Sequence, residues 1–112
     1  MEIITEKNGN VTVVTLAGEN LVAGNAKQFK QRVMPIFAPQ AKILFDLARL
    51  KFVDSTGLGV MVSCLRQATA AQGDLRLCSM SKSVRALFEL VRMHKVFEIY
   101  NTRDEALNAF RA

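Results

Sequence analysis

The residues with the most distinctive chemistry form one short segment, Asp54-Ser55-Thr56-Gly57-Leu58-Gly59. It follows an apolar stretch and leads into residues with helical spacing, so two hydroxyl groups are predicted at the start of a helix. Backbone N–H groups without helical partners and the positive end of the helix dipole meet there. Because glycine has no side chain, Gly57 and Gly59 are predicted to leave the backbone open to a phosphate or another chain.

A plainer interpretation of the same segment is that Ser55 or Thr56 caps the helix and the glycines serve packing. The enzymatic interpretations are not supported. The segment lacks the Gly-Lys-Ser/Thr of a phosphate-binding loop and does not complete a dinucleotide-binding glycine pattern. It is not a Gly-x-Ser-x-Gly elbow, and no base lies near the serine in sequence. We therefore expect a site for binding or modification and no enzymatic activity.

Metal and redox chemistry also find few candidate residues. The chain has a single histidine, His94, and two cysteines, Cys64 and Cys78, without any Cys-x-x-Cys or His-x-x-x-His pair. Such a set is too small for a zinc site or a histidine-centred triad. Both cysteines fall in segments that are predicted to be buried, where reduced core thiols are expected. We expect no metal and no cofactor.

Composition limits the class of protein. The 112 residues are half apolar, which favours one folded domain over residues 1–112 with its own core. No apolar run approaches the ~20 residues of a membrane span. The first residues lack the basic and apolar regions of a signal peptide, so a cytoplasmic location without membrane insertion is expected.

Positive charge exceeds negative charge, with 15 Lys and Arg against 10 Asp and Glu, a net charge of +5. The densest stretch carries five basic residues and the single acid Glu89, namely Arg76, Lys82, Arg85, Arg92 and Lys95. Several of them fall on the polar side of a predicted helix, which favours a solvated face. No aromatic residues interleave with them to stack bases, so nucleic-acid binding is not expected.

Hydrophobic spacing predicts the elements that must position the Ser55 segment. Residues 2–7 and 11–16 flank Asn8-Gly9-Asn10 and predict a β-hairpin, and residues 18–24 are expected to be a loop. Further strands are predicted at 42–47, 75–78 and 96–100. Helices are predicted from Asn25 as N-cap to the prolines at 35 and 39, from the Ser55 segment to Gly73, after Ser81 or Ser83, and after Thr102.

The resulting order is ββαβαβαβα. A hairpin gives antiparallel neighbours, whereas helical crossovers favour parallel ones. The predicted fold is therefore an α/β domain with a mixed sheet of about five strands and about four helices.

The run Phe52 to Val60, placed after the strand at 43–47, resembles the signature of STAS domains, specifically bacterial anti-sigma factor antagonists. The likeness continues in 73–77, 81–90, 96–100 and 105–107, so its clear part covers about residues 40–110. One departure lies in residues 18–26, which contain no aspartate where many members of the family have one.

The resemblance implies a role for each matching residue. Ser55 corresponds to the phosphoacceptor, with Thr56 as the second choice, and residues Asp54, Ser55, Thr56, Gly57, Leu58 and Gly59 would bind the partner. The unphosphorylated protein would bind a serine kinase that is also an anti-sigma factor, phosphorylation would release it, and a serine phosphatase would reset the switch. This is a partner-switching phosphoprotein in signal transduction and transcription regulation.

Other interpretations remain open. The chain could be a STAS subunit with a structural role in a transport or sensory complex, in which Ser55 is only a helix cap. A nucleotide-binding module that uses the glycine-bearing helix start is a further alternative. A monomer or weak dimer is expected, because no self-complementary patch is specified by the sequence.

Overall fold

The computed structural model describes residues 1–111 and contains a five-stranded mixed sheet in the order β1-β2-β4-β6-β7. Only β1 and β2 are antiparallel, and β2, β4, β6 and β7 run parallel to their neighbours. The strands are β1 Ile3–Asn8, β2 Val11–Leu16, β4 Lys42–Asp46, β6 Asp74–Cys78 and β7 Ile99–Tyr100. A separate parallel pair joins β3 Asn20–Leu21 to β5 Phe52–Val53.

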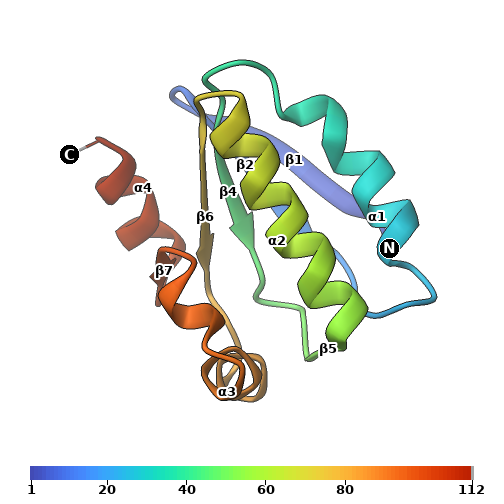
Figure 1. Ribbon diagram of the computed structural model, residues 1–112. Coiled ribbons are helices and arrows are strands. Elements are labelled where there is room, and N and C mark those ends of the chain that lie inside the picture. The colour runs from blue at the N-terminus through green and yellow to red at the C-terminus, as the bar shows by residue number, and fades with distance from the viewer. Residues whose placement is uncertain (112) are drawn as a thin grey trace.

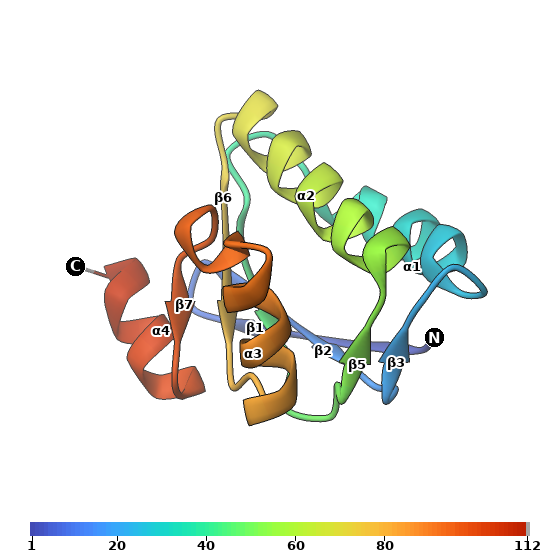
Figure 2. The ribbon, with the colours of Figure 1, turned by 60° about the horizontal axis from the view of Figure 1, so that its bottom comes forward.

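Helices cover both faces of the sheet, as Figures 1 and 2 show. The face packed by α1 and α2 also receives α3, and α4 covers the opposite face. The helices are α1 Ala26–Val33, α2 Ser55–Ala70, α3 Lys82–Leu90 and α4 Arg103–Arg111, with short 3-10 turns η1 Met34–Ile36 and η2 Met93–Lys95. Within the described residues, none of these helices has the length and apolar character needed to cross a membrane.

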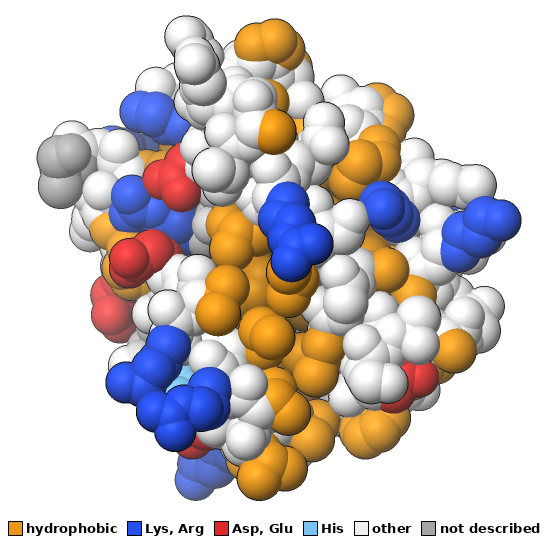
Figure 3. Space-filling view, viewed as in Figure 1, with side chains coloured by type: hydrophobic (Ala, Val, Ile, Leu, Met, Phe, Trp, Pro, Cys, Tyr) orange, Lys and Arg blue, Asp and Glu red, His pale blue; other side chains and the backbone are white. Residues whose placement is uncertain are grey.

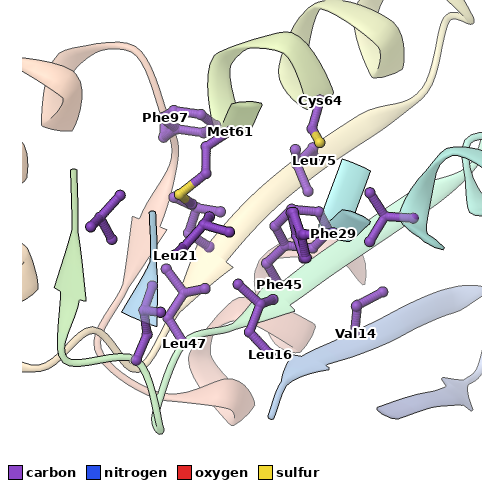
Figure 4. Packing of buried hydrophobic residues seen from close by; sticks show 14 of the residues in the cluster. Val14, Leu16, Leu21, Phe29, Phe45, Leu47, Met61, Cys64, Leu75 and Phe97 are labelled. Atoms are coloured by element: carbon purple, nitrogen blue, oxygen red, sulfur yellow. The ribbon is translucent and has the colours of Figure 1, made fainter. Parts of the chain in front are cut away.

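The larger core lies between the sheet and helices α1, α2 and α3 (Figure 4). It forms because alternate residues of each strand face one side and every third or fourth helical residue faces the sheet. Phe29 of α1 meets Phe45 of β4 edge to face at 5.9 Å between ring centroids. Figure 4 places Met61 of α2 beside Phe97, and both belong to this buried cluster.

The smaller core is made by α4 and the opposite sheet face, and an ion pair anchors it. The Asp46 side chain at the end of β4 is only 9% exposed. It accepts from Nε of Arg103 at 3.0 Å and from the backbone N–H of Ala48 at 3.0 Å. Arg103 also reaches Glu6 of β1 at 2.8 Å, so one guanidinium connects α4 to two strands.

The predicted fold class is confirmed, as are the hairpin, the long parallel strands and the Ser81 cap, which accepts from the Val84 N–H at 3.2 Å. Other details differ. The expected loop at 18–24 contains β3, which pairs with the unpredicted β5. The strand expected at 96–100 is reduced to Ile99–Tyr100, because residues 93–95 form η2 and Phe97 turns into the core.

Asn25 occupies the N-cap position of α1, but its side chain does not cap the helix. Instead, its Oδ1 accepts from the Val22 N–H at 2.9 Å and its Nδ2 donates to the Asn20 carbonyl at 2.8 Å. The predicted helix boundary is therefore correct and the predicted bond is wrong. The side chain stabilises the loop that precedes the helix, and this loop proves important for the site.

The Arg103 ion pair yields a stability prediction. Arg103→Met should lower the free energy of unfolding by about 2 kcal/mol, because the buried Asp46 carboxylate loses its cationic partner. Arg32→Met is the matched control, since Arg32 pairs with the exposed Glu2 at 3.3 Å. This control should cost about 0.5 kcal/mol. Urea unfolding measures both, and equal losses would contradict the anchoring role.

Candidate functional site

The site is centred on Asp54, the residue that caps α2. Its backbone is extended, with φ −92° and ψ −177°, and its Oδ1 accepts from the Gly57 N–H at 2.8 Å. An aspartate in this position satisfies one of the free N–H groups of the first helical turn. Ser55 is therefore the first residue of the helix, and the predicted cap at Ser55 or Thr56 belongs to Asp54 instead.

The second carboxylate oxygen of Asp54 binds a distant part of the chain. Oδ2 accepts from the Ala23 N–H at 2.9 Å, and the Asp54 N–H donates to the Leu21 carbonyl at 3.2 Å. These bonds extend the β3–β5 pair into the loop before α1. The start of α2 is thus fixed to a loop that lies some thirty residues earlier in the sequence.

These hydrogen bonds set the charge of the site. The Gly57 N–H and the Ala23 N–H both favour the ionised carboxylate and hold the pKa of Asp54 below its ordinary value of 3.8. Asp54 is therefore negatively charged at neutral pH and already occupies N–H groups that an added anion could use. A phosphate placed next to it would meet a fixed charge of the same sign.

Six residues were predicted to form the partner-binding segment, and the structure divides them. Ser55, Thr56 and Gly59 are exposed, Asp54 and Leu58 are half-buried, and Gly57 is buried. Both hydroxyl-bearing residues are thus on the surface. The exposure of Ser55 at the first position of α2 agrees with the sequence-based expectation of an accessible site.

The expectation that both glycines leave the backbone uncovered is wrong for Gly57. A Cβ at this position would lie 2.1 Å from the Leu21 carbonyl oxygen and 2.8 Å from Cγ1 of Val53. Gly57 is therefore required for the close approach of α2 to β3. A Cβ at Gly59, in contrast, would meet nothing within 4 Å. Of the two glycines, only Gly59 therefore leaves the backbone of the first turns of α2 uncovered.

The N-terminus of α3 lies beside this site. The Ser83 hydroxyl donates to the Lys51 carbonyl at 3.1 Å, next to β5. The Lys51 ammonium pairs with Glu19 at 3.6 Å, and the neighbouring Phe52 side chain is 46% exposed. The surface around Ser55 thus combines an exposed aromatic ring with a paired charge. Ser83 and Ala23 were missed as site residues, because their contacts join segments that are distant in the sequence.

The cysteines lie away from this site. Both are free and buried, and burial raises the pKa of the Cys64 thiol to about 12 and that of Cys78 to about 11. They are therefore protonated at neutral pH and are poor nucleophiles. Among the described residues, no cluster of three or more His, Cys, Asp or Glu side chains is arranged to hold a metal ion.

Comparison with known proteins places this architecture in a family. Residues 2–106 match the model of the STAS domain, and the chain belongs to the STAS domain family. A Bordetella bronchiseptica relative, BtrV, which is named as an anti-sigma factor antagonist, is 28% identical over 112 residues, covering 99% of this chain and 96% of BtrV.

Solved structures agree with the family assignment. The Thermotoga maritima protein TM1081, named for the same class, superposes with a TM-score of 0.89 at 26% identity, covering 98% of this chain and 95% of that one. The phosphorylated form of the Bacillus protein SpoIIAA has a TM-score of 0.70 at 21% identity, covering 97% and 99%, and this likeness concerns the fold alone. The chain is thus similar to anti-sigma factor antagonists over almost its whole length.

The two glycines of the site give opposite predictions. Gly57→Ala should lower the free energy of unfolding by about 1–3 kcal/mol, because the new methyl group overlaps the Leu21 carbonyl. Gly59→Ala should raise it by about 0.5–1 kcal/mol, because alanine favours the helix and the site is open. Urea unfolding tests the pair, and a shift of the same sign in both variants would refute the packing role of Gly57.

The lowered pKa of Asp54 gives a prediction about pH. Because the unfolded chain binds a proton at higher pH than the folded chain, this group stabilises the fold above pH 3.8 and loses that effect as the pH falls towards its lowered pKa. Asp54→Asn should therefore be less stable than the native chain at pH 7, and the difference should shrink below pH 3.8. A difference that is independent of pH would show that the charge of Asp54 contributes nothing.

Proposed function

We propose that this chain is a phosphorylation-switched interaction module that binds a serine kinase acting as an anti-sigma factor. The observation that carries the proposal is an exposed serine, Ser55, at the first position of α2 beside the ionised Asp54. Similarity to anti-sigma factor antagonists over 99% of the chain supports the same role. In this role the module acts in the cytoplasm and has no reaction of its own.

The switch uses one covalent change. The Ser55 hydroxyl oxygen attacks the terminal phosphorus of ATP held by the kinase, ADP leaves, and the serine proton passes to a base of the kinase. A serine phosphatase reverses the change by adding water to the phosphoserine, which frees inorganic phosphate. Thr56 is exposed as well and is the second candidate acceptor.

The electrostatic effect follows from the geometry at the helix start. Phosphate adds about −1.5 to −2 charges at neutral pH. Although a helix N-terminus usually welcomes an anion, Asp54 already accepts from the Gly57 and Ala23 N–H groups. The phosphate therefore projects from the surface beside a second negative charge. Burying that pair against a partner costs free energy, and a loss of ~3 kcal/mol is more than a hundredfold in affinity.

The folded state should survive the modification, because Ser55 is exposed and contributes no side chain to the core. The hydrogen bonds of Asp54 and the buried Gly57 hold the helix start in place without the serine hydroxyl. Phosphorylation would thus change the surface and leave the scaffold intact. The contact surface would comprise the exposed Ser55, Thr56 and Gly59 together with the exposed part of the half-buried Leu58.

A pull-down from lysate of the source organism tests the proposal. The baits are the native chain, Ser55→Ala, Ser55→Asp and the matched control Thr56→Ala, and mass spectrometry identifies captured proteins and phosphorylated residues. A serine kinase should be captured by all baits except Ser55→Asp, with phosphate on Ser55 of the native chain. Equal capture by all four baits, without phosphate, would instead support the structural-subunit role.

A further inference from the structure

An apolar surface begins within the first turn of α2 and lies between α2 and the segment that follows α3. Figure 3 shows hydrophobic side chains gathered in a continuous band between these elements. We define the apolar band as three half-buried residues of α2 and four residues of the segment that runs from the last residue of α3 to the residue after η2. They are Leu58, Val62 and Leu65, with Leu90, Val91, Met93 and Val96.

Helix geometry explains how α2 contributes to the band. Figures 1 and 2 place α1 along one flank of α2 and the segment around α3 on the other side. The buried residues Gly57, Met61, Cys64 and Ala68 mark the face of α2 that is turned to the core. At 100° per residue, Leu58, Val62 and Leu65 project from the other flank, away from α1 and towards η2. Phe97 follows η2 and packs beside Met61 of α2 (Figure 4). Its ring centroid lies 6.1 Å from that of Phe88 of α3. The two sides of the band are therefore held at a fixed spacing by the core.

The band is more exposed than packing of this chain alone requires. The Leu90 side chain is 78% exposed, Val96 49% and Val91 45%. Single exposed apolar residues are ordinary, but a contiguous group marks a surface that another molecule covers. The half-buried residues form the floor of the band, and these three residues form its more accessible end. An apolar patch of this kind is typical of the core of a protein–protein interface.

Basic charges predominate beside the band, where the exposed Glu89 is the acid that precedes Leu90. Arg66, the only charged residue of α2, is exposed on the Val62 side, and Arg92 and Lys95 are exposed on the η2 side. Within residues 1–111, none of these three cations forms an ion pair. A second copy of this chain would bring the same cations together, whereas a carboxylate-bearing partner would neutralise them.

The backbone of Arg92 adds an independent observation. Arg92 adopts a left-handed conformation, with φ 62° and ψ 23°, and follows Val91, the C-cap residue of α3. Helices usually place glycine or asparagine there, because a side chain is disfavoured at positive φ. A basic side chain is thus present at the edge of the band although glycine would stabilise the turn.

From these observations we propose that the apolar band binds an amphipathic helix of a partner protein, with apolar residues at i, i+3, i+4 and i+7 and carboxylates on its flanks. A rod-shaped partner suits a band that lies between two helical elements. Its carboxylates would pair with Arg66, Arg92 and Lys95. Leu58 also belongs to the proposed contact surface around Ser55, whereas Leu90, Val91, Met93 and Val96 lie outside that surface.

A displayed library of helices tests the proposal. Its members carry apolar residues at i, i+3, i+4 and i+7 and a random mixture of Asp, Glu, Lys and Ser on the flanks. When the library is selected for binding to the native chain, Asp and Glu should be enriched on the flanks. Backbone amide shifts on titration with one selected peptide should then cluster at the apolar band, and added salt should weaken binding. Absence of enrichment, or enrichment of Lys, would overturn the proposal.

Variants locate the binding. Leu90→Gln and Val96→Thr should each lower the affinity for the selected peptide about tenfold, the size expected for an interface anchor. Ile4→Thr is the matched control, since Ile4 is 47% exposed on β1, and it should bind as the native chain does. Arg92→Gly should raise the urea midpoint and yet weaken binding. Full affinity in Leu90→Gln or Arg92→Gly would contradict the proposal.

A membrane surface and a second copy of this chain are the two other molecules that could cover the apolar band, and each gives a distinguishable result. Binding to phosphatidylserine vesicles that depends on Leu90, without saturable peptide binding, would replace the partner helix by a membrane surface. Dimerisation of the native chain in sedimentation that is lost in Leu90→Gln would replace it by a second copy. Either result would overturn the proposal.

Discussion

The geometry of the site depends on the two hydrogen bonds that the Asp54 carboxylate accepts. One oxygen binds the first turn of α2 and the other binds the loop before α1, so a single side chain joins two segments that are far apart in the sequence. Both bonds favour the charged form, and the carboxylate therefore remains ionised. The same bonds leave Ser55 exposed and fix its position relative to a permanent negative charge.

The rest of the fold makes this arrangement possible. The parallel pair β3–β5 brings Leu21 within reach of α2, and only a glycine at position 57 permits that approach. The core beneath α2 holds the helix rigidly, and the Asp46–Arg103 ion pair fixes α4 on the opposite face. A charge added at Ser55 thus acts on a rigid surface, and the proposed switch operates through the surface without unfolding the chain.

The sequence predicts those features that have a local cause. The β1–β2 hairpin follows from Gly9, whose φ is +61°, and the start of α2 follows from a polar triplet before a helical pattern. It does not predict the β3–β5 pair, because two-residue strands have no periodicity and pair across thirty residues. For the same reason the contact of Ala23 with Asp54 was missed, whereas a packing role for Gly57 was one of the two interpretations of the segment. Exposure of Leu90 and Val96 also depends on where η2 places the chain, which no local pattern specifies.

In the proposed switch, phosphate on Ser55 excludes the partner by charge while the fold persists. The most direct measurement is calorimetric titration of the captured kinase with the chain carrying phosphoserine at position 55 and with the unmodified chain, together with urea unfolding of both. Phosphorylation should reduce the affinity about a hundredfold or more and leave the unfolding midpoint unchanged. Equal affinity of the two forms, or a loss that accompanies unfolding of the phosphorylated chain, would contradict the proposed switch.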